Sequence, residues 1–190
     1  MKAIDVANFF ITVGLMNEGT EMTNARINKL LYFAQGWHLV KTGEPLFNEN
    51  IEAWDYGPVV HNVYNKFKRY GKNIITEPSG NFDLNSMQDD DFEFLSDVFT
   101  NYSDFSTSAL INLTHKKNSP WDKTYVHGRN IVIPVRLMKE YFEALPDLHS
   151  TEDDIKKIPT VGYINDEGCT ILPKEYDDWN WAVGCVVGSR

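Results

Sequence analysis

The chain has 190 residues, of which 42% are hydrophobic and 24% charged. A chain of this length can bury about 70% of the surface that its unfolded form exposes, so we expect a sizeable core. Its formal net charge of -9, from 18 basic and 27 acidic residues, argues against binding to phosphate backbones. No long apolar run suggests a membrane span, and Asp5 and Asn8 interrupt the N-terminal apolar stretch in a way that argues against a signal peptide. Cys169 and Cys185 are too few for a disulfide framework, so we expect a cytoplasmic protein.

Two helices are predicted at the start of the chain. The first has apolar residues at three- and four-residue intervals after Asp5, which we take as its N-cap, and it ends at Gly19. The second begins after Thr23 and ends at Gly43. Its apolar surface is wide enough to predict a helix that is packed on most sides. We therefore expect this helix to lie at the centre of the fold.

A short strand and a third helix follow. Residues 51–56 alternate in a way that favours an extended segment. Gly57 and Pro58 then predict the start of a helix that ends at Gly71, because proline suits the first helical position. The polar residues 72–87 predict a surface loop.

The second half is predicted to hold more helices and a C-terminal hairpin. Asp89, Asp90 and Asp91 precede a helix that includes Phe92, because negative charge favours a helix N-terminus. Shorter helices are predicted after Ser106 or Thr107, at Pro120 and Trp121, and from Ile133 and Pro134 to Pro146. Residues 161–164 and 169–172 flank a turn ending in glycine and predict a hairpin, with residues 181–187 as a further strand.

These elements predict an α+β, mainly α-helical fold. We expect a compact helical domain at residues 1–146, built around the central buried helix and carrying a small β element. Residues 147–190 are then a short, β-rich C-terminal extension, packed on that domain as a hairpin or small sheet.

Chemistry-bearing motifs are missing from the sequence. The five histidines are scattered, with no metal-ligand spacing, and no nucleophile turn occurs. We therefore predict no catalytic residues, no metal, no cofactor and no enzyme activity. His115 stands out because it falls at a predicted helix end, where protonation is favoured. The alternative is a capping or core-edge histidine.

Aromatic residues are candidates for partner contact. Trp54, Tyr56 and Trp121 are amphipathic side chains of the kind that dominate binding energy at protein interfaces. We add Pro58 and His115 to this predicted partner-binding set. Core packing is the competing interpretation for each aromatic.

Several blocks of the sequence carry a family resemblance. They are KLLYFAQGWHLV at residues 29–40, PLF at 45–47, IEAWDYGPVVHNVY at 51–64 and THKKNSPW at 114–121. In order and spacing they resemble the Panacea domain, also called the SocA-like or GepA phage-associated family of bacteria and their phages. The resemblance covers about the first 145 residues. It departs from the family pattern at Ile27 and Asn28 and in the link before Pro120.

The resemblance implies an antitoxin that neutralises a cognate protein toxin by direct binding. Two alternatives stay open: a proteolytic adaptor that delivers a toxin to a ClpXP-type protease, and a nucleic-acid-binding regulator. The regulator would need the basic cluster at residues 66–72 to join a larger basic face. Trp179 and Trp181, next to Asp177 and Asp178, are predicted to add partner specificity. The alternative is that the extension only covers the helical core.

Overall fold

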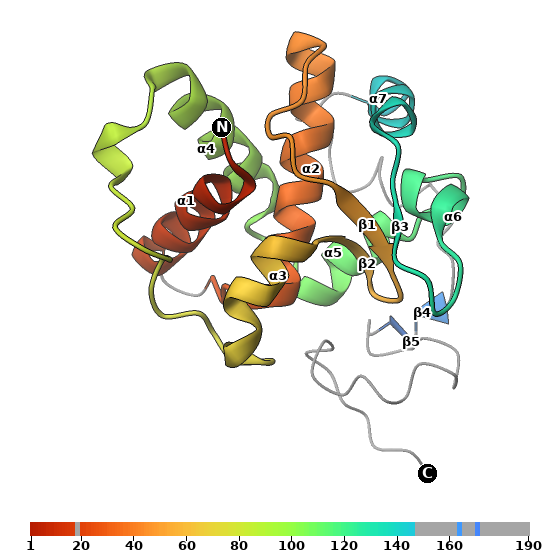
Figure 1. Ribbon diagram of the computed structural model, residues 1–190, viewed down its shortest axis with the longest axis horizontal. Coiled ribbons are helices and arrows are strands. Elements are labelled where there is room, and N and C mark those ends of the chain that lie inside the picture. Colours follow the sequence, from red (N-terminus) through yellow and green to blue (C-terminus); the bar gives the residue numbers. More distant parts are fainter. Residues whose placement is uncertain (18–19, 147–162, 165–169, 172–190) are drawn as a thin grey trace.

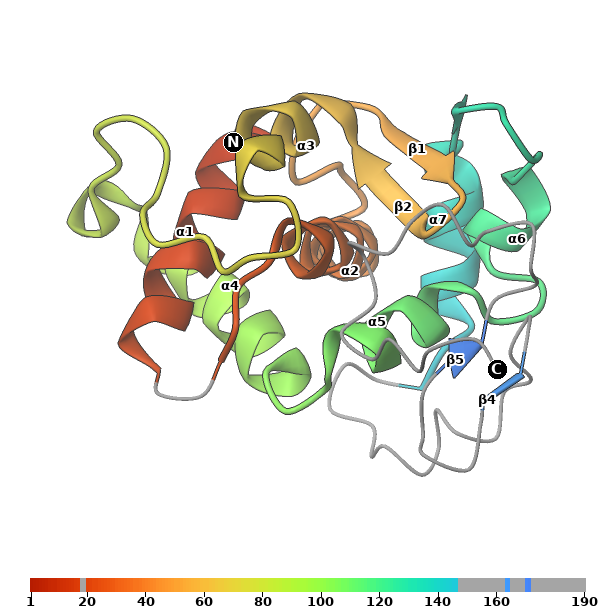
Figure 2. The same ribbon diagram turned by 90° about the horizontal axis from the view of Figure 1, so that it is seen from below.

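A computed structural model describes residues 1–17, 20–146, 163–164 and 170–171. One long helix, α2 (Asn24–Thr42), runs through the middle of the molecule (Figure 1). It contacts α1, α3, α4, α5, α7 and strand β2. Figure 2 shows α2 nearly end-on, surrounded by these elements. This arrangement confirms a mainly helical α+β fold around a central buried helix.

The two N-terminal helices begin in different ways. Helix α1 spans Ala3–Met16 and follows Lys2, so Asp5 lies in its first turn and the prediction that Asp5 is the N-cap was wrong. Its carboxylate still lies where negative charge favours a helix N-terminus. Helix α2 starts and stops as predicted: the Thr23 hydroxyl accepts a hydrogen bond from the Arg26 amide, and Gly43 adopts a left-handed conformation. The predicted stop at Gly19 falls outside the described residues.

A three-stranded antiparallel sheet packs beside α2. Its order is β2-β1-β3, with β1 at Ile51–Trp54, β2 at Gly57–Val60 and β3 at Ile131–Val132. The predicted helix start at Gly57 and Pro58 was wrong: both belong to β2, and helix α3 (His61–Phe67) begins after the strand. Pro58 pairs with Ala53, and Gly57 supplies a positive φ of 95° right after the two-residue turn.

Helix α4 (Asp89–Tyr102) follows a loop that holds two short 3-10 turns, η1 (Lys68–Tyr70) and η2 (Leu84–Ser86). Three aspartates occupy its first turn, as predicted. Phe92 is 42% exposed, whereas Phe94 is buried. The ring of Phe92 nevertheless contacts Phe9 of α1, with centroids 5.7 Å apart.

The remaining elements complete the fold as α5 (Thr107–Thr114), α6 (Pro120–Thr124) and α7 (Val135–Glu143). Ser106 and Ser119 cap α5 and α6 with their hydroxyls. The predicted C-terminal hairpin is confirmed: β4 (Tyr163–Ile164) pairs antiparallel with β5 (Thr170–Ile171), and β5 contacts α5. The further strand predicted at residues 181–187 lies outside the described residues. No helix of the described part is long and apolar enough to cross a membrane.

Candidate functional site

The amino group of Lys29 is buried beneath the β1–β2 hairpin. Lys29 lies in α2 with only 1% of its surface exposed, and its Nζ donates a hydrogen bond to the carbonyl oxygen of Pro58 at 3.0 Å. Burial lowers the pKa of this amine from 10.5 to about 7, because the charged form loses its water. The Lys29 side chain of the central helix therefore forms a buried contact with the hairpin.

Gly57 allows the hairpin to approach Lys29 this closely. A Cβ at position 57 would lie 2.7 Å from Thr114 Oγ1 and 3.0 Å from Lys29 Nζ. The positive φ of Gly57 also disfavours any residue with a side chain. Glycine is thus required here for two independent reasons.

His115 and Trp121 contact the backbone of the hairpin at its turn. The Trp121 indole donates from Nε1 to the carbonyl of Trp54 at 2.7 Å, and its ring lies 3.7 Å from that of His115. The His115 ring has Nδ1 at 2.7 Å from the Ile111 carbonyl and Nε2 at 3.4 Å from the carbonyl of Asp55. The THKKNSPW segment therefore has a structural role, because its His115 and Trp121 rings hold the turn of the hairpin in place.

Burial, together with the nearby Lys29, lowers the pKa of His115 to about 4, although the hydrogen bonds to the Ile111 and Asp55 carbonyls oppose the shift. The expectation that the helix end would favour protonation of His115 was therefore wrong. Desolvation outweighs the helix dipole because the imidazole is 2% exposed. The His115 ring is neutral at physiological pH and serves as a packing and hydrogen-bonding group.

The far end of strand β2 is attached to α2. Asn28 Oδ1 accepts the backbone N–H of Val60 at 2.9 Å, and Asn28 Nδ2 donates to the carbonyl of Asn24. Asn24 in turn donates to the carbonyl of Tyr64 in α3. The hairpin is thus fixed at both strands and at its turn by side chains of α2, α5 and α6.

The outer face of this hairpin carries a group of partly exposed side chains that we call the Trp54 cluster: Glu52, Trp54, His61 and Tyr64. The Trp54 indole donates to Glu52 Oε2 at 2.8 Å. Its ring packs edge-on against His61 at 5.7 Å and Tyr64 at 4.9 Å. An amphipathic aromatic on a rigid support is typical of residues that anchor protein contacts.

The residues predicted to bind a partner lie in two different environments. Tyr56, Pro58, His115 and Trp121 are buried, and each packs within the hairpin region. Trp54 is half-buried and reaches the surface. Trp179 and Trp181 lie outside the described residues. Core packing thus accounts for the buried four, and contact between a partner and any of these residues stays a prediction.

Sequence reasoning missed four residues of the site: Lys29, Glu52, His61 and Tyr64. Lys29 did carry a signal, because a charged residue within a wide apolar helical surface needs a buried partner. Glu52, His61 and Tyr64 carried none, since they meet Trp54 only after the chain has turned back through β2. Their positions depend on the hairpin, which was predicted as a helix start.

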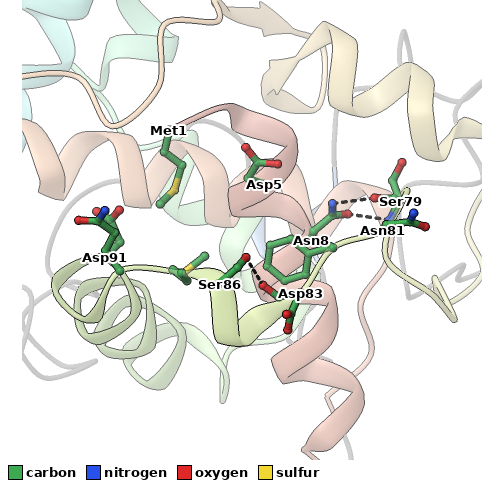
Figure 3. A pocket seen from close by; sticks show the side chains of 11 residues that line it. Met1, Asp5, Asn8, Ser79, Asn81, Asp83, Ser86 and Asp91 are labelled. Carbon is green, nitrogen blue, oxygen red and sulfur yellow. Dashed lines mark hydrogen bonds between the residues drawn. The ribbon is translucent and has the colours of Figure 1, made fainter.

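A separate pocket of about 440 Å³ lies between the start of α1, the loop after residue 78 and the start of α4 (Figure 3). Asn8 exchanges two hydrogen bonds with the Ser79 backbone on its wall. The acidic residues of the lining are Asp5, Asp83 and Asp91, with no basic residue beside them. The pocket is therefore unsuited to an anion. Among the described residues, no group of three or more His, Cys, Asp or Glu side chains is arranged to hold a metal ion.

Known proteins resemble this chain over the region that contains the β1–β2 hairpin and the residues that hold it in place. The family model "Antitoxin SocA-like, Panacea domain" matches residues 27–122, which is just over half of the chain. Antitoxin SocA of Caulobacter vibrioides (strain NA1000 / CB15N) is 34% identical over 110 residues. That alignment covers 53% of this chain and 58% of the relative, and no solved structure matches. The chain therefore belongs to the antitoxin SocA-like, Panacea-domain family.

Proposed function

We propose that this protein is an antitoxin that neutralises a cognate protein toxin by direct binding, without catalysing a reaction. The observation that carries the proposal is the family match, which covers the residues that hold the hairpin, from Asn28 to Trp121. Those residues are mostly buried, so their shared task is to hold a surface in a fixed shape. A preformed surface reduces the entropy lost on binding.

The charge of the chain supports a basic partner. A net charge of -9 attracts a cationic protein over a distance of about a Debye length, and raising the salt concentration screens this attraction. We therefore expect the association rate with the toxin to fall as ionic strength rises, while the dissociation rate changes little. We also infer that the protein acts in the cytoplasm, as its two cysteines suggest.

Coexpression tests the proposal. Each open reading frame adjacent to this gene is expressed alone and together with this chain, and growth is followed. We expect one neighbour to arrest growth alone and not in the pair, and the two purified proteins to elute as one complex in size-exclusion chromatography. A neighbour that is harmless alone, or a toxin that is neutralised without forming a complex, contradicts the proposal.

The same strains test the proteolytic alternative. Direct neutralisation leaves the amount of toxin unchanged when the ClpXP-type protease is deleted. An adaptor role predicts that toxin accumulates and growth stops in the deletion strain, even though this chain is present. Toxin abundance measured by immunoblot in both strains decides between the two mechanisms.

The C-terminal extension is proposed to add specificity through Trp179 and Trp181. The test is a chain that lacks residues 160–190, compared with the double variant Trp179→Ala, Trp181→Ala. If the extension only covers the core, truncation lowers the melting temperature and the double variant still neutralises the toxin. If it recognises the toxin, the double variant folds normally and loses neutralisation.

A further inference from the structure

The outer face of the sheet has an apolar row with one carboxylate in its centre. Glu52 is paired across the sheet with Val59 of β2 on one side and with Val132 of β3 on the other. Directly opposite residues of antiparallel strands point to the same face. Val132 is 41% exposed, so this face is open to solvent on the β3 side. Trp54 lies opposite Gly57, which has no side chain to cover it.

The Glu52 carboxylate accepts fewer hydrogen bonds than its two oxygens allow. Its side chain is 18% exposed, and one oxygen, Oε2, receives the Trp54 indole N–H. The other oxygen, Oε1, lies 3.8 Å from His61 Nδ1, which is beyond hydrogen-bonding distance. An ionised carboxylate can accept about four hydrogen bonds. Among the described residues no lysine or arginine forms an ion pair with Glu52, so a negative charge in apolar surroundings is left without a cation.

We propose that the Trp54 cluster is the docking site for an arginine side chain of the protein toxin. This inference rests on the proposed function. A guanidinium can stack on the Trp54 indole and donate to Glu52 Oε1 at the same time, because it is planar and carries donors along its edges. Val132, which is exposed, then offers apolar surface to the methylene groups of the same side chain.

Arginine fits this site better than lysine. An ammonium is compact and strongly hydrated, so contact with the carboxylate places it away from the ring face. The net charge of -9 on the whole chain also favours a positively charged partner. The ring of His61 borders the site, with its Nδ1 3.8 Å from Glu52 Oε1.

The first experiment uses a small probe in place of the toxin. N-acetyl-arginine-amide is titrated into the full chain, and the indole N–H signal of Trp54, assigned with Trp54→Phe, is followed by NMR. We expect a saturable shift with millimolar affinity that is about tenfold weaker with N-acetyl-citrulline-amide, which has the same shape without the charge. Equal shifts with both amides, or no saturable shift, overturn the proposal without requiring any variant.

Variants then locate the contact. Glu52→Gln is expected to weaken binding of the arginine amide about tenfold, whereas Glu93→Gln, at an exposed carboxylate of α4, leaves it unchanged. Equal effects of the two variants contradict the site. Retention of the wild-type spectrum elsewhere shows that Glu52→Gln still folds.

Coexpression links the site to the toxin. Glu52→Arg should abolish neutralisation of growth arrest and Glu93→Arg should not. If the wild-type chain binds the arginine amide but the Glu52→Arg variant still neutralises the toxin, the docking role is refuted. If no toxin is found, the proposed function fails, yet the amide titration still reports on the site itself.

Discussion

Replacing Lys29 by methionine should stabilise the protein, although lysine sits within the family's most recognisable block. The folded state holds the Lys29 pKa at about 7, whereas an unfolded chain has the ordinary value of 10.5. Burying this amine therefore costs about 4 kcal/mol of unfolding free energy at pH 7. Methionine has a similar length and no charge to bury. The Pro58 carbonyl loses a donor, which costs about 1–2 kcal/mol, so we expect a net gain of about 2–3 kcal/mol.

The pH dependence gives the sharper signature. Between pH 7 and 10.5 the unfolded chain binds the Lys29 proton and the folded chain does not, so the stability of the wild type rises with pH in this window. The slope from this single group is at most about 1.4 kcal/mol per pH unit. Below pH 7 both states are protonated and the contribution is constant. Lys29→Met should lack this slope.

Urea unfolding of wild type and Lys29→Met at a series of pH values from 6.5 to 9.5 measures both effects. Lys72→Met, at an exposed lysine of the loop after η1, controls for the loss of one surface charge and should change neither stability nor slope. The difference between the two curves isolates Lys29 from other titrating groups, including Lys116, whose pKa burial also lowers. A variant less stable than wild type, or with the same slope, refutes the argument.

Three further changes test the contacts around the β1–β2 hairpin and those of Arg26 in α2. Gly57→Ala should destabilise the fold by at least about 3 kcal/mol, because the added Cβ would clash with Thr114 and the φ of Gly57 is positive. Gly128 has a similar φ but open space around it, so Gly128→Ala should cost only about 1 kcal/mol. Chemical denaturation measures both variants. Stability should fall as pH drops from 6.5 towards 4, because only the unfolded chain protonates His115 there, and His115→Gln should flatten this part of the curve. Arg26→Met should lower the melting temperature by several degrees, because Arg26 donates to the carbonyls of Tyr102, Ser103 and Phe105. An unchanged melting temperature would show that water replaces those bonds.

Helices were predictable from the sequence because their signals are local. The Thr23 cap, the Gly43 stop and the aspartates at 89–91 each act within one turn of the chain, and each was placed correctly. The β1–β2 hairpin was not predictable, because its turn is Asp55-Tyr56 instead of an Asn-Gly type and because Pro58 argues against a strand. Its position is set by hydrogen bonds from Lys29, Asn28 and Trp121, which are distant from the hairpin in sequence.

The site was partly predictable for the same reason. Trp54 was identified from its residue type, which indicates a surface anchor wherever it is exposed. The roles of Tyr56, His115 and Trp121 depend on burial, and burial follows from tertiary packing that no periodicity of α5 or α6 encodes. A motif rich in aromatic and polar residues therefore does not by itself distinguish a contact surface from the support beneath it.

The packing of α7 bears on how much of the chain forms one unit. Helix α7 lies beyond the family match at residues 27–122, yet the Phe142 ring fills the space beside Gly36 in α2 and leaves no room for a Cβ there. The same ring contacts Tyr32, Phe33 and Trp37 edge-on. Removing α7 would expose three aromatic side chains of the central helix, Tyr32, Phe33 and Trp37. The matched region therefore needs α7 to bury its own core.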